Sequence, residues 1–466
     1  MLVYVSHRQF EDRCFILHKA QVADTGVQPP YTLMVVAAWA ERFGHQVAIL
    51  DSNAEEMTPR EILDRIRRFG PAVIGLSLTT YNLHYYVRLA RMVKESFPPI
   101  PIVVGGRHLQ YYPERTLHHP EFDYGLCGEA ETNLHLFLEA LQGTRPLDRV
   151  PGAVYRENGT VRAVPVKPLQ EDLSTLPHPA RHLVNNKRYW NIFSRADFFT
   201  MTMASRGCPY NCYFCDVGKT RARFRSAEHI YEEMEQCRRV YGIREIDFQD
   251  STFTLDMGMV EGLCRRLLDA RLDVQYVIRS RADKLDRATA SLLARSGCHM
   301  VMFGIESGHP EVLKRANKRM DLASVEEAVR TARQAGMETV GFFIVGLPGD
   351  TTATVKQTLR FAEKLPLDYA LFNRLMVLPN TEFYRQIQER TGTTYWEDFV
   401  LDPQEATHPE MLDTELTEQQ VKDLVAMCWR RYYFRPGKLL RLVLRVRTPL
   451  AFLRRVRIAL DLIRRR

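Results

Sequence analysis

Three cysteines stand close together near the middle of this 466-residue chain. Cys208, Cys212 and Cys215 are separated by three and two residues, so one loop can bring three thiolates to a single soft metal centre. Three thiolates are one ligand short of a closed structural zinc site or of a cluster held only by protein. An iron–sulfur cube bound in this way keeps one iron open to an outside ligand, which favours chemistry over a structural role.

The same triplet also fits a zinc site with His229 as the fourth ligand. His229 lies fourteen residues after Cys215 and follows Ser226, a suitable helix cap, so we expect its side chain to point elsewhere. The other six cysteines are scattered and are expected to be ordinary buried thiols: Cys14, Cys127, Cys237, Cys264, Cys298 and Cys428. An odd total of nine cysteines argues against a disulfide framework and favours a reducing compartment.

The composition is that of a folded globular protein, with 45% hydrophobic and 26% charged residues, which excludes a disordered or collagen-like chain. The length predicts two or three domains. No apolar run approaches the ~20 residues that cross a bilayer, and the first residues do not resemble a signal peptide, so we expect a cytoplasmic protein. The net charge of +8 is concentrated in residues 438–466, which hold ten Lys or Arg and one Asp. The rest of the chain is about neutral, and we expect no nucleic-acid partner.

Short apolar runs alternate with helical patterns over residues 1–145, which predicts a doubly wound, Rossmann-like α/β domain. The runs are residues 2–5, 46–50, 73–78, 102–104 and 124–126, and the helical patterns are residues 33–43, 59–69, 86–97 and 132–141. Residues 146–192 are expected to form a hairpin that turns at Asn158-Gly159, followed by a linker around Leu176–Pro179.

A second strand–helix series occupies residues 193–395 and predicts a partial six-stranded barrel. Its strands are expected at 199–203, 245–249, 273–278, 299–305, 339–345 and 369–376, with helices at 228–240, 259–270 and 322–335 among them. Residues 396–466 are expected to form a helical C-terminal region with a basic tail.

Residues 195–395 resemble the radical S-adenosylmethionine (radical SAM) enzymes. Besides the cysteine spacing, four segments follow in the order of that family: Phe248–Ser251, Gly304–Gly308, Gly341–Gly349 and Leu378–Thr381, in which Asn380 replaces the usual Gly. The resemblance implies a (β/α)6 barrel and a [4Fe-4S] cluster on the three cysteines, with SAM on its open iron. It implies SAM contacts at Phe214, Asp250, Ser251, Glu306, Ser307 and Gly346.

The first domain resembles the cobalamin-binding domain that precedes the barrel in one branch of these enzymes. Ligands of open α/β sheets bind at the carboxyl ends of the strands, where this sequence has glycines and hydroxyls. The residues implied at cobalamin are Ser77, Thr79, Gly105, Gly106, Gly128 and Glu129. No Asp-x-His-x-x-Gly motif is present, so we expect the lower face of cobalamin to lack a histidine, and His7, His18, His84 and His108 are only weak candidates.

The resemblance favours a cobalamin-dependent methyltransferase that cleaves SAM and abstracts hydrogen from unactivated carbon. The anaerobic magnesium-protoporphyrin IX monomethyl ester cyclase shares every motif named above, so oxidative cyclisation is the alternative. A non-catalytic corrinoid or cluster sensor is a second alternative, against which Ser251 and Glu306 argue. Six aromatic residues either line the substrate space or pack in the core: Tyr81, Tyr85, Tyr86, Tyr189, Trp190 and Phe193.

The basic tail, residues 438–466, combines helical spacing with apolar and basic faces. Lys438, Arg441 and Arg445 share one side, and after Pro449 apolar residues recur at steps of three and four between arginines. This pattern fits contact with an anionic membrane at the inner face, or a terminal helix packed on the barrel. The expected partners are a small-molecule, lipid or tetrapyrrole substrate and a reductant such as flavodoxin or ferredoxin.

Overall fold

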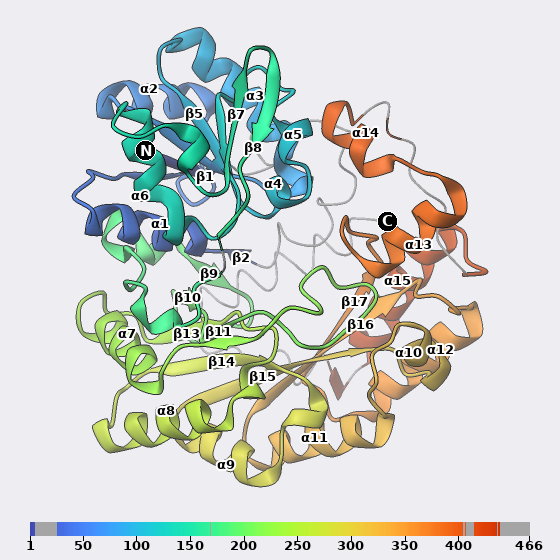
Figure 1. Cartoon of the computed structure of the whole chain (residues 1–466). Helices are drawn as coiled ribbons and strands as arrows, with labels where there is room; N and C mark the ends of the chain where they lie inside the picture. The colour runs from blue at the N-terminus through green and yellow to red at the C-terminus, as the bar shows by residue number, and fades with distance from the viewer. Residues whose placement is uncertain (5–25, 168, 404–405, 407–413, 436, 439–466) are drawn as a thin grey trace. The chain divides into compact units, whose positions relative to one another are not determined.

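The computed structural model describes residues 1–4, 26–167, 169–403, 406, 414–435 and 437–438. Two compact units are present (Figure 1). The first unit contains residues 1–191 and 394–408, and the second contains residues 192–393 and the chain from residue 409 onward. In the described residues, no helix is long and apolar enough to cross a membrane.

The first unit is built on a seven-stranded sheet with the order β3-β1-β4-β5-β6-β7-β8. The strands are β1 (Leu2–Tyr4), β3 (Ile49–Asp51), β4 (Ile74–Ser77), β5 (Ile102–Gly105), β6 (Tyr124–Leu126), β7 (Ala153–Glu157) and β8 (Thr160–Ala163). The first five in this order run parallel, and each overlaps an apolar run predicted as a strand. The doubly wound α/β prediction is confirmed.

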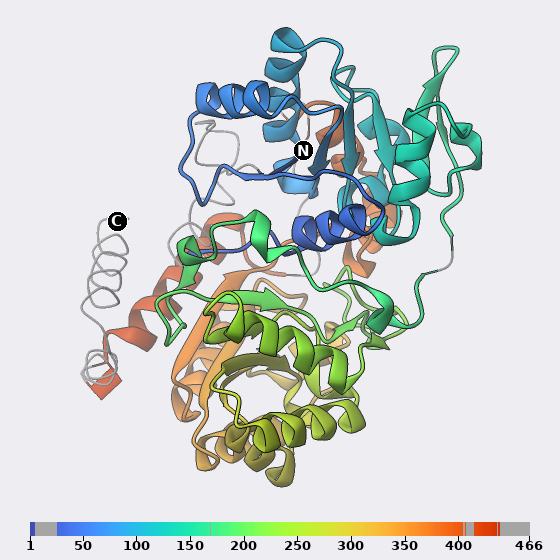
Figure 2. The ribbon, with the colours of Figure 1, turned by 90° about the vertical axis from the view of Figure 1, so that its left-hand side faces the viewer.

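Helices cover both faces of this sheet (Figure 2). They are α1 (Tyr31–Arg42), α2 (Pro59–Phe69), α3 (Leu83–Ser96), α4 (Arg107–Tyr111), α5 (Pro113–Thr116) and α6 (Ala130–Leu141). Apolar residues of α2 and α3 pack in one core cluster with Val3, Leu76 and Val104, whereas α1 and α6 pack in two others. Thr58 and Glu61 form a capping box that begins α2 at the predicted residue, because Pro59 suits a first helical position.

The predicted hairpin is present and joins this sheet. Asn158 and Gly159 have φ values of 49° and 81°, as a two-residue turn between β7 and β8 requires. Strand β7 pairs antiparallel with β6, so the hairpin extends the first sheet, although we expected it in a segment between two domains. Residues 177–180 form no regular element, as the prolines predict.

Helix α14 (Tyr395–Leu401) belongs to the first unit, although the chain on both sides of it belongs to the second. It packs against α5. His84 Nε2 donates to the carbonyl oxygen of Phe399 and His119 Nε2 donates to that of Val400, both at 2.7 Å. The C-terminal region that we predicted as one helical extension is therefore divided between the two units.

The second unit is built on a six-stranded parallel sheet with the order β10-β13-β14-β15-β16-β17. The strands are β10 (Thr200–Thr202), β13 (Glu245–Phe248), β14 (Gln275–Ser280), β15 (Cys298–Glu306), β16 (Glu338–Val345) and β17 (Tyr369–Arg374). All six overlap the predicted strands. The chain order equals the spatial order, which is the partial barrel expected from the sequence.

The two faces of this sheet differ. Val301, Phe303 and Ile305 on β15 pack in the large core cluster, whereas Met300 and Met302 point to a smaller apolar cluster on the other face. The outer helices cover the first face (Figure 1): α7 (Ala227–Arg239), α8 (Met257–Ala270), α9 (Arg287–Arg295), α11 (Leu322–Gln334), α12 (Thr352–Lys364) and α15 (Glu418–Tyr433). The remaining helices of the unit are α10 (Pro310–Arg315) and α13 (Glu382–Thr391).

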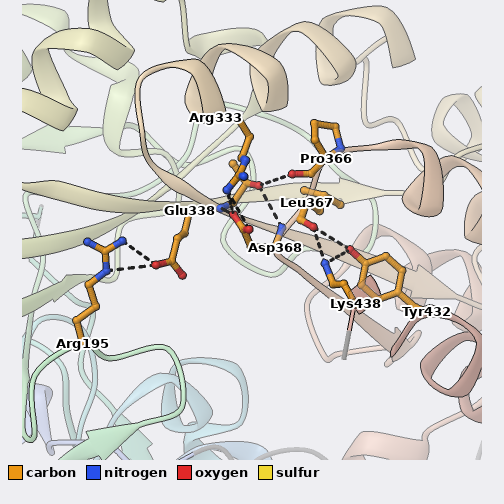
Figure 3. A network of polar contacts seen from close by, with 9 residues as sticks. Arg195, Arg333, Glu338, Pro366, Leu367, Asp368, Tyr432 and Lys438 are labelled. Atoms are coloured by element: carbon orange, nitrogen blue, oxygen red, sulfur yellow. Dashed lines mark hydrogen bonds and ion pairs between the residues drawn. The ribbon is translucent and has the colours of Figure 1, made fainter. Parts of the chain in front are cut away.

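A polar network surrounds the amino-terminal ends of β16 and β17 (Figure 3). Arg333 contacts the carboxylate of Asp368 at 2.8 Å, and Asp368 also accepts from the amide of Thr339 at 2.8 Å. Lys438 donates to the carbonyl oxygen of Leu367 at 2.6 Å and is only 9% exposed. Lys438 is therefore anchored inside the second unit, which agrees at this residue with a terminal segment packed on the barrel. Residues 439–466, like Cys14, His7 and His18, lie outside the described residues.

We expect Asp368→Ala to lower the free energy of unfolding by about 2–3 kcal/mol, because it leaves the Thr339 amide unsatisfied and breaks a partly buried ion pair. Glu327→Ala is the matched control, since Glu327 pairs with Arg330 on the same helix but with both side chains more than half exposed. Its effect should stay below about 0.5 kcal/mol. Anaerobic urea denaturation measures both values, and equal effects would contradict the network's importance.

Candidate functional site

The cysteine loop is closed at its base by a short two-stranded ladder. Strand β11 (Ser205–Arg206) pairs antiparallel with β12 (Arg223–Phe224), so residues 207–222 form a closed loop that follows β10. Gly207 has a φ of 92°, and a Cβ atom there would lie 2.2 Å from the carbonyl oxygen of Arg221. Only glycine permits this close return of the backbone.

Hydrogen bonds inside the loop fix the backbone of each cysteine. The amide of Cys208 donates to Thr220 Oγ1 at 2.9 Å, and the amide of Thr220 donates to the carbonyl oxygen of Cys208 at 3.0 Å. The amide of Lys219 donates to the carbonyl oxygen of Tyr210 at 2.8 Å, and that of Cys215 to Cys212 at 3.1 Å. The loop is thus ordered by its own polar contacts.

The three thiols are close enough to affect one another. Burial raises the pKa of Cys212 and of Cys215, and the neighbouring thiolate charges, Cys215 on Cys212 and Cys208 on Cys215, raise these pKa values further. Lys318 and Arg281 act on Cys212 in the opposite direction. The three cysteines that the sequence singled out therefore lie on one loop and interact electrostatically in neighbouring pairs.

A single zinc ion is the alternative to a cluster at these cysteines. Among the described residues, no three His, Cys, Asp or Glu side chains are placed so that they could hold one metal ion. His229 Nδ1 accepts from Arg225 Nε at 3.0 Å, so this ring nitrogen is already engaged in a hydrogen bond. A cube binds each thiolate to a different iron, so its sulfur ligands stand farther apart than the ligands of one ion.

Lys318 and Arg281 are cations near the cysteines that sequence reasoning missed. Lys318 Nζ lies 2.9 Å from Glu306 Oε1, and both side chains are more than nine-tenths buried. Burial lowers the pKa of Lys318, but the charges of Glu306 and Cys212 outweigh this effect, so the net pKa is raised and the amine stays charged. Arg281 lies 3.9 Å above the ring of Tyr210. No sequence signal marks these two residues, because the chain holds 64 Lys and Arg.

Two residues predicted to contact SAM, Asp250 and Ser307, form hydrogen bonds with other residues of the protein. Asp250, which is 1% exposed, accepts from the amide of Ala204 at 3.0 Å and from Ser205 Oγ at 2.5 Å. Burial raises its pKa in spite of these bonds. Ser307 Oγ contacts Thr358 Oγ1 at 3.1 Å. Neighbouring Ser251 is exposed.

The remaining predicted SAM residues lie beside the loop. The amide of Gly346, at a φ of 92°, donates to buried Asp350 Oδ2 at 2.9 Å. Phe214 packs against an apolar cluster that includes Leu347 and Phe383, so it lies close to the Gly346 turn. Glu306, at a φ of 70°, ends β15 in the left-handed conformation, which is uncommon for a residue with a side chain.

The residues predicted at cobalamin lie at the carboxyl ends of three adjacent strands. Ser77 ends β4, Gly105 ends β5, and Gly128 follows β6. The strand order reverses between β1 and β4, and such reversals form the ligand crevice of open α/β sheets. Thr79 is exposed beside this edge, and Glu129 precedes α6.

Gly106 permits the chain after β5 to pack closely against the end of β4. Its φ is 94°, and a Cβ atom would lie 2.6 Å from the carbonyl oxygen of Leu78 and 3.1 Å from Ser77 Oγ. Gly128 has a φ of 89°. Both glycines adopt a conformation that residues with side chains rarely take, at the strand ends where open α/β sheets bind their ligands.

The histidines described near this edge serve packing. His108 is fully buried with Nδ1 3.0 Å from Thr80 Oγ1, and burial lowers its pKa to about 3. His84 binds α14, and burial lowers its pKa to about 4. Among the aromatic candidates, Tyr86 and Tyr189 are fully buried in the core.

Two family models match the chain: the "Radical SAM superfamily" over residues 203–362 and the "B12 binding domain" over residues 22–138. An uncharacterized methyltransferase of Pyrococcus horikoshii is 32% identical over 432 residues, which cover 91% of this chain and 91% of that protein. The anaerobic magnesium-protoporphyrin IX monomethyl ester cyclase of Rubrivivax gelatinosus is 24% identical and covers 89% of this chain and 76% of its own length.

Among solved structures, TsrM from Kitasatospora setae, a radical SAM methyltransferase with cobalamin and a [4Fe-4S] cluster bound, has the same fold. It is 21% identical, with a TM-score of 0.68, and the alignment covers 88% of this chain and 84% of that one. Fold and sites thus define a radical SAM protein with a B12-binding domain. The chain belongs to the cobalamin-dependent radical SAM methyltransferase family. Its cofactors are a [4Fe-4S] cluster, SAM and cobalamin.

Thr220→Val should weaken cluster retention, because it removes the hydroxyl that accepts from Cys208 and donates to Val217. We expect the loop to lose about 1–3 kcal/mol and the iron content of the reconstituted protein to fall. Thr220→Ser keeps the hydroxyl and should retain wild-type iron. Iron content equal in all three proteins would show that this bond does not matter.

Gly106→Ala should reduce cobalamin retention at least tenfold, because the new Cβ meets backbone at 2.6 Å in addition to the strained φ. Gly143→Ala is the matched control: its φ is 79°, but nothing lies within 4 Å of its Cβ position. Cobalt per chain after desalting measures retention. If both variants lose cobalt equally, the loss in Gly106→Ala comes from backbone strain and not from contacts at the carboxyl ends of the strands.

Proposed function

We propose that this protein methylates an unactivated carbon of a small molecule, with the radical SAM core in residues 193–395 and the cobalamin-binding region in residues 1–145. The observation that carries the proposal is the three-cysteine loop at the carboxyl end of β10, together with the glycine edge at the ends of β5 and β6. When bound, the cluster supplies the electron that cleaves SAM, and cobalamin carries the methyl group.

In this proposal Cys208, Cys212 and Cys215 hold the cluster, and the open iron takes SAM. Lys318 is a buried cation next to Cys212, so its ammonium is suited to hold the carboxylate of SAM. Glu306, its ion-pair partner, is suited to the amine or the ribose. Asp250 accepts from the backbone of Ala204 and so positions the start of the cysteine loop. Ser307 accepts from the backbone of His309 and so positions the chain after β15.

The inner face of the second sheet supports a substrate with an apolar body. Val277, Met300, Met302 and Val340 form its apolar cluster, and Phe193 packs beside them at a ring distance of 5.2 Å from Tyr369. Such a wall excludes water from a reactive centre. Likeness to the cyclase supports oxidative cyclisation as the second candidate, because that relative is similar over 89% of this chain.

For the setting of the enzyme we propose the cytoplasm, with a low-potential flavodoxin or ferredoxin as reductant. Contact of the basic tail with the inner face of the membrane is proposed on the sequence of residues 439–466. Liposome flotation tests it: binding to anionic vesicles that is lost on removal of these residues supports membrane contact, and no binding supports a packed helix.

Cys212→Ala should abolish formation of 5′-deoxyadenosine, because two thiolates cannot retain the cluster with its open iron. The control is Cys428→Ala, which removes a fully buried thiol of α15 and should lower stability while product formation continues. Chromatography of anaerobic reactions with a chemical reductant measures the product. Its persistence in Cys212→Ala would overturn the radical SAM assignment.

SAM with a deuterated methyl group separates the two chemistries. For a methyltransferase we expect the label in the product and one cobalt per chain in the reconstituted protein. Cyclisation would leave the product unlabelled. An intact iron–sulfur spectrum without cobalt retention would remove methyl transfer as the leading function.

A further inference from the structure

The cysteine loop has an excess of basic residues. Residues 205–225 contain five Lys or Arg and one Asp, in a chain that is about neutral outside its tail. Arg223 and Arg225 are buried, and Arg225 pairs with Glu233 at 2.5 Å. Lys219 and Arg221 are exposed, and they lie on one turn, residues 218–221, which we call the first basic turn.

The first basic turn is joined directly to a cluster ligand. Residue Thr220 exchanges two hydrogen bonds with the backbone of Cys208, at 2.9 and 3.0 Å. Lys219 is 60% exposed at its side chain, and its nearest acidic partner, Glu382, is 3.8 Å away and already pairs with Arg385. A protein that contacts this turn therefore reaches Cys208 through one residue and one hydrogen bond.

A second basic turn, residues 317–319, lies on the other side of Tyr210. The carbonyl oxygen of Tyr210 accepts from Lys219, while its ring lies under Arg281. Arg281 donates to the carbonyl oxygens of Lys318 and Arg319 at 3.2 and 3.1 Å. Exposed Arg319 is thereby held next to the loop, and Asn317 Nδ2 adds a bond of 2.6 Å to the carbonyl oxygen of Asn211.

Backbone strain concentrates in the same two turns. Lys219, Asn317 and Arg319 have φ values of 61°, 50° and 45°, in a region that residues with side chains avoid. Strain of this kind persists only where the surroundings enforce it, often at functional sites. Lys219 and Arg319, both exposed, therefore stand on two turns of uncommon backbone conformation beside the cysteine loop.

We propose that the two basic turns form the docking surface for an acidic one-electron carrier protein of the flavodoxin or ferredoxin class. The carrier gives up one electron and is oxidised, and the cluster accepts that electron and is reduced, so no further reactant is needed. Positive side chains attract an acidic carrier and accelerate its encounter, most strongly at low salt. This inference rests on the proposed function only in that the cluster must be present and reducible.

The test compares two reductants on the anaerobically reconstituted protein. Reduced flavodoxin is the protein carrier, and photoreduced deazariboflavin is a small uncharged reductant that needs no docking surface. In the double variant Lys219→Glu, Arg221→Glu we expect the rate constant with flavodoxin at low salt to fall at least about tenfold. The rate with deazariboflavin and the subsequent cleavage of SAM should equal those of wild type.

Lys364→Glu is the matched control. Lys364 is 68% exposed and also pairs with a glutamate, Glu326, but it ends α12, away from the cysteine loop. Its rate with flavodoxin should equal that of wild type. Should the double variant lose iron, Lys219→Gln with Arg221→Gln replaces it, with an expected fall of about threefold.

Two outcomes overturn the docking surface: an unchanged flavodoxin rate in the charge-reversed or neutral variant, or an equal fall in Lys364→Glu. Failure of the proposed function looks different, because wild-type protein would then fail to be reduced by deazariboflavin or would not cleave SAM after reduction.

Discussion

The buried carboxylate of Asp250 joins the second sheet to the cysteine loop, and the rest of the site depends on this joint. It follows β13 and holds Ala204 and Ser205, the residues through which the chain leaves β10 for the loop. The loop takes its position from this end, from its internal hydrogen bonds, and from the packing of Phe214 against the apolar cluster beside it. The β11–β12 ladder, the Gly207 return and the Cys208–Thr220 bonds all begin from that fixed end. The buried carboxylate of Asp250 thus fixes the point from which the three-cysteine loop starts.

Much of the fold could be predicted, because its parallel strands are buried on both faces and stand out as short apolar runs. The hairpin at Asn158-Gly159 and the start of α2 at Pro59 were predictable for a different reason, since local backbone chemistry alone determines them. The cysteine triplet was predictable because its three ligands lie within one loop. Features encoded within a few residues of sequence, such as the strands, the hairpin turn and the helix start, were thus predicted correctly.

Features that depend on distant neighbours could not be predicted. Lys318 and Arg281 look like any surface cations in the sequence, and only the fold buries them beside Cys212. Asp250 and Ser307 were expected to face SAM, but neighbours from other segments engage their side chains. For Lys438 the sequence left a membrane surface and packing on the barrel open, and the carbonyl oxygen of Leu367, 71 residues earlier, accepts from its buried amine. In each case the partner of a polar side chain is set by tertiary packing, and the hydrophobic periodicity of the sequence carries no information about it.

Helix α14 has a consequence for how the protein is made. The first unit needs residues 395–401 to cover His84 and His119, but these residues leave the ribosome only after almost the whole second sheet has been synthesised. The amino-terminal unit therefore cannot complete its packing during its own synthesis, unlike a domain formed from one continuous segment. Until α14 has been synthesised, His84, His119 and the aromatic residues beside them in the first unit remain exposed to solvent. Cutting the gene at the junction near residue 192 would leave the amino-terminal fragment without residues 394–408, whereas all residues of the second unit would remain in the other fragment.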